Sequence, residues 1–333
     1  MSSDEVEPVT LPERPVRSLH SLHQTQIGNG RARRSDPTRG RAIRNTVLSS
    51  FFLGWAPILG KLAYAQGVAP FSLAALRTVV AVLLLWGWYL LMHRDWLVRL
   101  RWGELAGCIA VGAVNGIGSL LYYTGLSRLD ASLASFLNTL YILWVVLFLA
   151  ASGQPVGRLT LLRIALAIGG VYLLTGGTRG EPNWLGAMLM VASAATFGWH
   201  LVMGQWLLAD VPSQAATPYI LTAMAITVGL AQALEGQPVE AISPDGWRAI
   251  IALGATTAIS RLLMFTGLRR LGGIETALIS LLELVVSLGL AFLILGERMT
   301  PLQWVGGSIL VFSILLGVRE SSPETSAHWK SGE

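Results

Sequence analysis

Charged residues are scarce in this chain of 333 residues. Lys, Arg, Asp and Glu make up only 13% of the sequence, whereas 53% of it is hydrophobic. A soluble domain has about 25% charged residues. The few charges gather near the two ends and between apolar runs of about 20 residues, a length that crosses about 30 Å of hydrocarbon. The composition therefore excludes an ordinary soluble domain and predicts a membrane protein.

Cysteine and enzyme signatures are also scarce. The single cysteine, Cys108, lies in an apolar run, so no disulfide framework and no metal site can be built from it. The sequence has no His-Glu-x-x-His, no Gly-x-Ser-x-Gly and no Walker A loop. We therefore expect no enzyme activity, no cofactor and no metal, and transport could not be driven by ATP hydrolysis in this chain.

The apolar runs predict an all-α membrane protein with ten transmembrane helices and short connections. The predicted spans are 45–66, 70–92, 103–124, 130–151, 158–176, 184–208, 214–235, 247–268, 274–296 and 301–318. A short basic turn, 269–273, separates the eighth span from the ninth. Residues 1–44 read as a disordered basic tail, because they are polar and rich in Pro, Ser, Arg and Gly, and residues 319–333 read as a second tail.

The placement of Lys and Arg predicts the orientation. With the N-terminus inside, seven arginines fall on the cytoplasmic side and three fall outside: Arg94, Arg99, Arg101, Arg158, Arg269, Arg270 and Arg319 against Arg128, Arg179 and Arg298. Both tails are then cytoplasmic. The arginines of the first tail could bind nucleic acid or anionic lipid, but we favour a role in setting the topology and expect no nucleic-acid partner.

The chain contains the same unit twice. Residues 109–129 align with 251–271 at an offset of 142, with twelve of 21 positions identical, and 54–61 align with 198–205 at an offset of 144. The unit is five spans long, 45–177 and again 184–318. Because five is odd, the second copy enters the membrane from the opposite side. Such an inverted repeat is typical of secondary transporters, with a binding site between the halves near the midplane.

Two charges lie near the centres of predicted spans, Arg261 in the eighth and Glu283 in the ninth. A charge there costs about 2.5–3.5 kcal/mol on insertion scales, so it faces a partner or a wet cavity. One reading is a substrate or proton site, and the other is a structural ion pair. Their repeat counterparts are Ser119 and Tyr141, so the two halves are polar at the same depth but not identical.

Other candidates for the cavity wall are aromatic or hydrogen-bonding side chains at similar depth. Trp55 and Trp199 occupy matching places, although core packing is the commoner role for such residues. The hydrogen-bonding candidates are Asn115, Asn138, Tyr141 and His200. Lys61 and Arg77 lie in the outer halves of their spans. They either snorkel to the headgroups or form an electropositive vestibule.

Several motifs resemble the EamA domain of the drug/metabolite transporter superfamily. They are Gly54-Trp55 with Lys61, Pro70 to Arg77, Tyr123-Thr124-Gly125-Leu126, Phe265-Thr266-Gly267-Leu268, and Gly296-Glu297-Arg298. The likeness covers about 45–318. It implies an inner-membrane carrier of small metabolites, with spans 1, 3, 4, 6, 8 and 9 around a central cavity and spans 5 and 10 packed outside them.

Two departures from the family stand out. Gln154 stands where the first half of the family usually has a glutamate, and the spans holding Tyr141 and Glu283 lack a mid-span proline. If that proline breaks the helix in relatives, straighter spans are expected here.

The resulting hypothesis is an exporter of small metabolites such as amino acids, working by alternating access. The alternatives are a passive channel and a membrane scaffold. Glu283 is the candidate for proton coupling, the expected partners are a small-molecule substrate and the bilayer, and no pattern predicts the oligomeric state.

Overall fold

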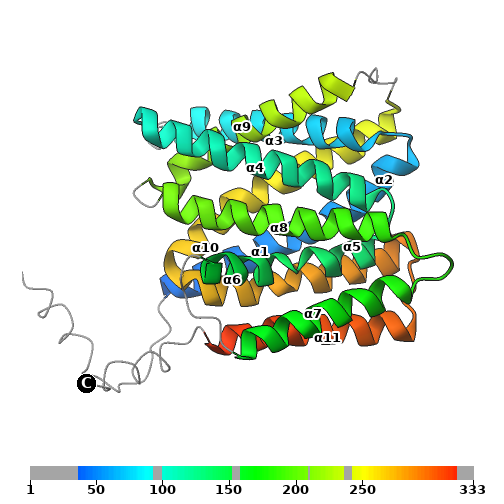
Figure 1. Ribbon diagram of the computed structural model, residues 1–333. Coiled ribbons are helices and arrows are strands. Elements are labelled where there is room, and N and C mark those ends of the chain that lie inside the picture. Colours follow the sequence, from blue (N-terminus) through cyan, green and yellow to red (C-terminus); the bar gives the residue numbers. More distant parts are fainter. Residues whose placement is uncertain (1–36, 93–99, 152–157, 209–210, 236–241, 321–333) are drawn as a thin grey trace, which may run out of the picture. The chain divides into compact units, whose positions relative to one another are not determined.

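The computed structural model describes residues 37–92, 100–151, 158–208, 211–235 and 242–320. These residues form helices and no strand (Figure 1). The elements are α1 (Pro37–Gly54), α2 (Ala56–Ala65), α3 (Pro70–Met92), α4 (Trp102–Leu126), α5 (Ala131–Asn138), α6 (Tyr141–Ala151), α7 (Arg158–Gly176), α8 (Trp184–Leu207), α9 (Ser213–Glu235), α10 (Pro244–Leu290), the π-helix η3 (Ala291–Leu295) and α11 (Pro301–Glu320). Most of the two predicted tails lies outside the described residues, and so does Gln154.

Six stretches among the described residues are long and apolar enough to cross a membrane. They are Gly40–Ala65, Pro70–Met92, Trp102–Leu126, Ala131–Ala151, Trp184–Gly204 and Gln214–Glu235. Three shorter apolar helices accompany them: Leu161–Gly176, Leu281–Leu295 and Pro301–Leu316. Large apolar side chains such as Leu83 and Met188 are 66% and 69% exposed, as lipid-facing residues are. The chain is therefore a multi-pass membrane protein.

The first predicted span begins earlier than expected and is broken in two. Helix α1 starts at Pro37, eight residues before the predicted start, because proline fits the first position of a helix, where its missing N–H costs nothing. The break comes at Trp55, between α1 and α2, where Pro57 follows as the second residue of α2. Proline cannot donate the hydrogen bond that would carry one helix through.

The fourth predicted span is also broken, although it contains no proline. Helix α5 ends at Asn138 and α6 begins at Tyr141. In between, the amides of Thr139 and Leu140 donate to the carbonyl oxygens three residues back, at 3.1 and 3.2 Å. The Thr139 hydroxyl also donates to the Phe136 carbonyl oxygen, at 2.6 Å. The fourth span is therefore interrupted for two residues even without the family's mid-span proline.

The predicted turn at 269–273 is not a break in the helix. The backbone is helical without interruption from Pro244 to Leu290. The stretch from 264 to 280 contains no proline, and a glycine costs a helix only about 1 kcal/mol. The side chains of Arg269 and Arg270 lie outside the described residues.

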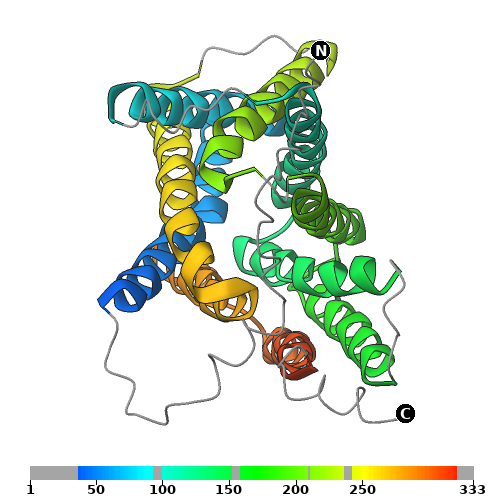
Figure 2. The same cartoon turned by 90° about the vertical axis from the view of Figure 1, so that its left-hand side faces the viewer.

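Helix α10 nevertheless doubles back. Ser49 of α1 donates its hydroxyl to the Ser260 carbonyl at 2.9 Å, and Ser287 donates to the Gly54 carbonyl at 2.8 Å. Ser260 and Ser287 would lie about 40 Å apart on a straight helix, whereas their partners on α1 are only about 7.5 Å apart. Figures 1 and 2 show the yellow first half and the orange second half of α10 as two separate rods.

The contacts between the two repeats come in symmetric pairs, in which each residue is replaced by its counterpart from the other repeat. A Cβ added at Gly112 would lie 2.5 Å from the carbonyl oxygen of Ile220 on α9, and one added at its counterpart Gly254 would lie 2.9 Å from the carbonyl oxygen of Arg77 on α3. Ile220 follows Arg77 by 143 residues, between the repeat offsets of 142 and 144, and we take it as the counterpart of Arg77. In each repeat, a glycine of the third span therefore packs closely against the second span of the other repeat, as a two-fold interface requires.

A second pair of contacts follows the same rule. A Cβ at Gly54 would lie 3.0 Å from the carbonyl oxygen of Glu283, and one at Gly198 would lie 3.1 Å from that of Tyr141. These are the counterparts at offsets 144 and 142. The repeat read from the sequence is therefore present in the packing, although its most polar residues differ.

Counterpart helices run in opposite directions where they touch. On α3 and α9, Ser72 donates to the Gln232 side chain at 3.2 Å, whereas Tyr89, farther along α3, donates to the carbonyl of Gln214, which comes earlier on α9. Helices α7 and α11 pack on one another in the same antiparallel manner. The two-fold axis relating the repeats is therefore steeply inclined to these helices.

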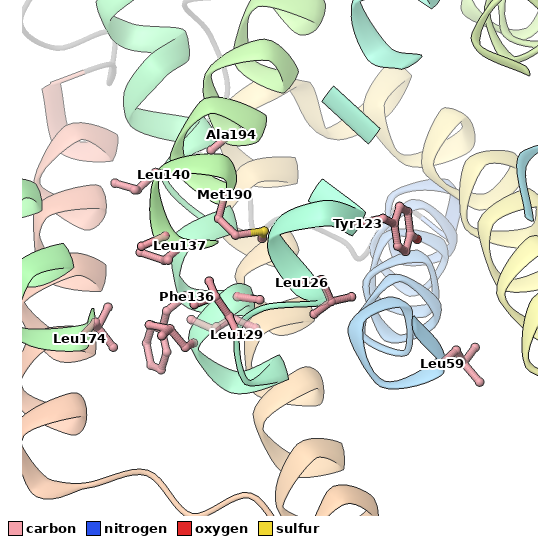
Figure 3. Close-up of a cluster of buried hydrophobic side chains, with 14 of the residues drawn as sticks. Leu59, Tyr123, Leu126, Leu129, Phe136, Leu137, Leu140, Leu174, Met190 and Ala194 are labelled. Carbon is pink, nitrogen blue, oxygen red and sulfur yellow. The ribbon is translucent and has the colours of Figure 1, made fainter. Parts of the chain in front are cut away.

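The main buried cluster joins helices of both repeats. Figure 3 shows this cluster extending from Phe136 on the left, past Met190 of α8 and Leu126, to Tyr123 and Leu59 on the right. These residues come from α2, α4, α5 and α8, and the cluster also includes Leu73 of α3 and Leu253 of α10, the helices that carry most of the polar site described below. Cys108 is buried in a separate apolar cluster, as expected for a core residue.

We expect Gly112→Val to lower stability by about 1–3 kcal/mol, because its side chain would meet the backbone of α9, which cannot move aside. Thermal unfolding in detergent measures the change. Gly229→Ala on α9 is the matched control, since nothing lies within 4 Å of a Cβ there. Equal melting temperatures for Gly112→Val and the parent chain would contradict the close crossing.

Candidate functional site

A buried arginine joins the two repeats. Arg77 on α3 is only 8% exposed. Its Nη2 donates to Ser119 Oγ on α4 at 2.6 Å, and its Nη1 reaches Thr257 Oγ1 on α10 at 3.4 Å. The guanidinium carbon also lies 4.7 Å from the ring centre of Tyr123, in cation–π range. Arg77 therefore points into the protein, rather than along its surface as a snorkelling side chain does.

Arg261 lies one helical turn after Thr257, on the same face of α10. It is half-buried, and its Nε is buried with no hydrogen-bond partner. Its charge interacts with those of Arg77 and Glu283. Among the described side chains, however, no Arg261 nitrogen lies within 4.0 Å of the Glu283 carboxylate, so the two residues are near one another without forming a direct ion pair.

Glu283 lines a small cavity. The cavity has a volume of about 20 Å³, room for about one water molecule. Its wall is polar on several sides, and includes Tyr122, Ser135, Asn138, Thr139, Tyr141 and Ser287. Asn138 and Tyr141 flank the break between α5 and α6, so the irregular backbone of the fourth span faces the cavity.

An aromatic row continues from the cavity along α8. The Tyr141 ring meets Phe197 edge-on at 5.1 Å, and Phe197 stacks on His200 at 5.7 Å with an interplanar angle of 14°. The Nδ1 atom of His200 lies 3.0 Å from the carbonyl oxygen of Val111 on α4. Because a carbonyl can only accept, Nδ1 carries the proton of this bond. His200 also interacts electrostatically with Arg261.

The two symmetric tryptophans do not line this cavity. Trp55 stands at the break before α2, with its ring 6.4 Å from Phe51. Trp199 meets Phe148 at 5.2 Å and Trp206 at 5.8 Å. Their contacts are those of packing residues.

Asn115 is buried on α4, between two glycines that contact α9, and its counterpart in the second repeat is Thr257. One member of this matched pair therefore contacts Arg77.

Lys61 belongs to a different cluster, at the start of α5. Here Glu297, which follows η3, accepts from the amides of Ala131 and Ser132 at 2.7 and 2.8 Å and from the Ser132 hydroxyl at 2.7 Å. The charge of Lys61 interacts with Glu297 and Asp130. Local desolvation and the charge of Glu297 raise the pKa of Asp130, and Lys61 opposes them. The family motif at Glu297 thus caps a helix of the other repeat.

We expect Glu297→Gln to lower stability by about 1–2 kcal/mol. A carboxylate at a helix N-terminus makes charge-assisted bonds, and an amide loses both the charge and one acceptor. Thermal unfolding in detergent measures the effect, with Glu104→Gln at the start of α4 as a comparison cap. An unchanged melting temperature for Glu297→Gln would count against the cap.

The structure thus groups Arg77, Arg261 and Glu283 with the tyrosines of α4, and leaves the tryptophans and Lys61 elsewhere. Sequence reasoning missed Tyr122 and Thr257. The signal was present, because Tyr122 lies one turn from Ser119, the counterpart of Arg261. Among the described residues, no three His, Cys, Asp or Glu side chains gather as a metal site would require.

These features are those of a membrane transporter built from a duplicated helical unit. The chain belongs to the EamA-like transporter family, which it matches twice, over residues 41–176 and 184–319. It is 28% identical over 266 residues to the Bacillus subtilis (strain 168) protein named uncharacterized transporter YcbK, covering 76% of this chain and 85% of that one. A crystal structure described only as that of a protein has a similar fold, with a TM-score of 0.60 at 20% identity, covering 85% of this chain and 99% of the other.

Proposed function

We propose that this protein is a secondary transporter that exports small metabolites, amino acids among them, across the inner membrane by alternating access. The observation that carries the proposal is the two-fold exchange of contacts between the repeats around Arg77, Arg261 and Glu283. Two similar halves can exchange roles and so open the same site to either side of the membrane in turn.

The proposed topology has ten spans in two inverted sets of five, with both termini in the cytoplasm. The antiparallel packing of α3 on α9, and of α7 on α11, supports the inversion. The reversal within α10 supports counting its two halves as separate spans.

The cavity at Glu283 favours a transporter over a passive channel. It has room for about one water molecule, whereas a conducting channel needs a continuous wet path. A substrate therefore requires the helices to move before it can enter, which is the condition for a two-state cycle.

The test is efflux from proteoliposomes that contain the purified full chain and are loaded with a panel of small metabolites. Saturable efflux of a subset supports the proposal. Efflux that never saturates, far above about 10³ molecules per second, would favour a channel, since typical turnover numbers reach only about that value. No efflux of any compound would contradict transport.

Glu283 is also the proposed site of proton coupling, because it is a carboxyl group beside the cavity. Protonation would remove the negative charge that interacts with Arg261. Efflux is then expected to slow when the pH gradient is collapsed with an ionophore. Unchanged efflux under that condition would remove the coupling role.

A further inference from the structure

The central cluster carries an excess of positive charge. Arg77 and Arg261 each contribute one positive charge and Glu283 one negative charge, with histidine and tyrosine counted as neutral. The side chains that contact Arg77 are hydroxyl or aromatic groups, namely Ser119, Thr257 and Tyr123. Among the described residues, the cluster therefore has a net charge of +1 inside the membrane, where an unbalanced charge is costly.

The two guanidinium groups also have hydrogen-bonding capacity to spare. The Nε atoms of Arg77 and Arg261 are both buried and lack a hydrogen-bond partner. Among the residues that the structure describes, neither arginine forms an ion pair within 4.0 Å with a carboxylate. A guanidinium presents its N–H groups in a planar fork that matches a carboxylate, and it cannot lose its charge.

The two guanidinium groups lie close to one another. Arg77 reaches Thr257, and Arg261 is one turn farther along the same face of α10. Their like charges repel one another. A single anionic group between them would relieve this repulsion and accept hydrogen bonds from both.

The geometry points to a small carboxylate of net charge −1 as the substrate, with its carboxylate held between Arg77 and Arg261. This inference rests on the proposed function and specifies its substrate class. With Glu283 ionised, a monoanion balances the site, whereas a neutral zwitterion leaves it at +1. A phosphate ester, which carries about −1.5 to −2 near pH 7, exceeds the balance. The rings of Tyr122 and Tyr123 on α4 suit the organic part of the molecule.

The test compares substrates that have nearly the same shape and differ by one charge. Proteoliposomes with the full chain are loaded with equal amounts of aspartate and asparagine, glutamate and glutamine, lactate and lactamide, and glycerol phosphate. The membrane potential is clamped at zero with valinomycin and equal K⁺, so that charge itself gives no driving force. Efflux of each compound is followed by mass spectrometry.

We expect each carboxylate to leave at least tenfold faster than its amide partner and faster than glycerol phosphate. Arg77→Gln should remove this preference, because one half of the proposed clamp is lost. Arg163→Gln is the matched control: Arg163 is buried between α7 and α11, where its Nε donates to the Ser313 carbonyl. This control should keep the preference of the parent chain.

The outcomes separate the two proposals. Efflux of the amides as fast as the acids, or a preference that survives Arg77→Gln, would overturn the carboxylate site while transport itself stands. Faster efflux of glycerol phosphate than of every carboxylate would also overturn the choice of a monoanion. If no compound leaves vesicles that contain correctly folded protein, the proposed transport function is contradicted as well. If Arg77→Gln does not fold, Arg261→Gln provides the same comparison from the other guanidinium.

Discussion

Glu283→Gln is expected to lower the transport rate of a confirmed substrate by more than tenfold, while the chain remains folded in detergent. The glutamine has nearly the same shape but no charge, so it leaves the charges of Arg77 and Arg261 without a balancing carboxylate. Removing one partner from a buried set of charges costs about 2–5 kcal/mol or more, and a tenfold loss corresponds to about 1.4 kcal/mol. Initial efflux rates from proteoliposomes measure the change.

Two further variants show whether the loss is specific. Arg261→Gln should reduce efflux by a similar factor, because it removes the charge that interacts with Glu283. Arg163→Gln removes a buried arginine from the contact between α7 and α11 and should leave efflux close to that of the parent protein when corrected for folded protein. Undiminished transport by both Glu283→Gln and Arg261→Gln would remove these residues from the site.

A cysteine at position 127 and a cysteine at position 269 should react with a membrane-impermeant maleimide from opposite sides of the membrane. Ser127 is exposed in the segment between α4 and α5, and Arg269 is its counterpart in the second repeat, at an offset of 142. Counterpart segments of inverted repeats face opposite sides. Intact cells should therefore label Ser127→Cys and leave Arg269→Cys unlabelled until the membrane is opened.

This experiment uses a background in which Cys108 is replaced by alanine, so that each variant has a single reactive thiol. Arg298→Cys serves as a second outside position, since Arg298 is exposed before α11. Labelling of positions 127 and 269 from the same side would contradict the inverted topology. Labelling of 269 alone from outside would keep the inversion and reverse the predicted orientation.

The repeat and most helix positions could be predicted from the sequence, because both depend on local patterns. The length of an apolar run of about 20 residues directly indicates a membrane span, and the repeat is visible as identical residues at an offset of 142. The site was only partly predictable. Arg261 and Glu283 stood out as charges in apolar runs, but the bonds from Arg77 to Ser119 and Thr257 join residues 42 and 180 positions apart. Such pairings depend on packing between distant helices.

The helix breaks show a second limit of sequence reasoning. The break at Trp55 carries a local signal in the nearby Pro57, whereas the break at Thr139 has only a threonine, whose hydroxyl bonds its own backbone. A threonine in an apolar run is common in unbroken helices as well, so only the structure distinguishes the cases. The reversal of α10 is hidden for a similar reason, since its backbone stays helical throughout.

The unequal chemistry of the two halves has an energetic consequence. If the two repeats exchange roles, each contact is replaced by its counterpart. The charged residues have uncharged counterparts, however: Ile220 for Arg77, Ser119 for Arg261 and Tyr141 for Glu283. In the proposed alternating-access cycle, the inward-facing and outward-facing forms would therefore place the same three charges in different surroundings, and we expect them to have unequal free energies. We expect such a carrier, when unloaded, to rest with its site open to one preferred compartment, and to run its forward and reverse cycles at different speeds under equal gradients.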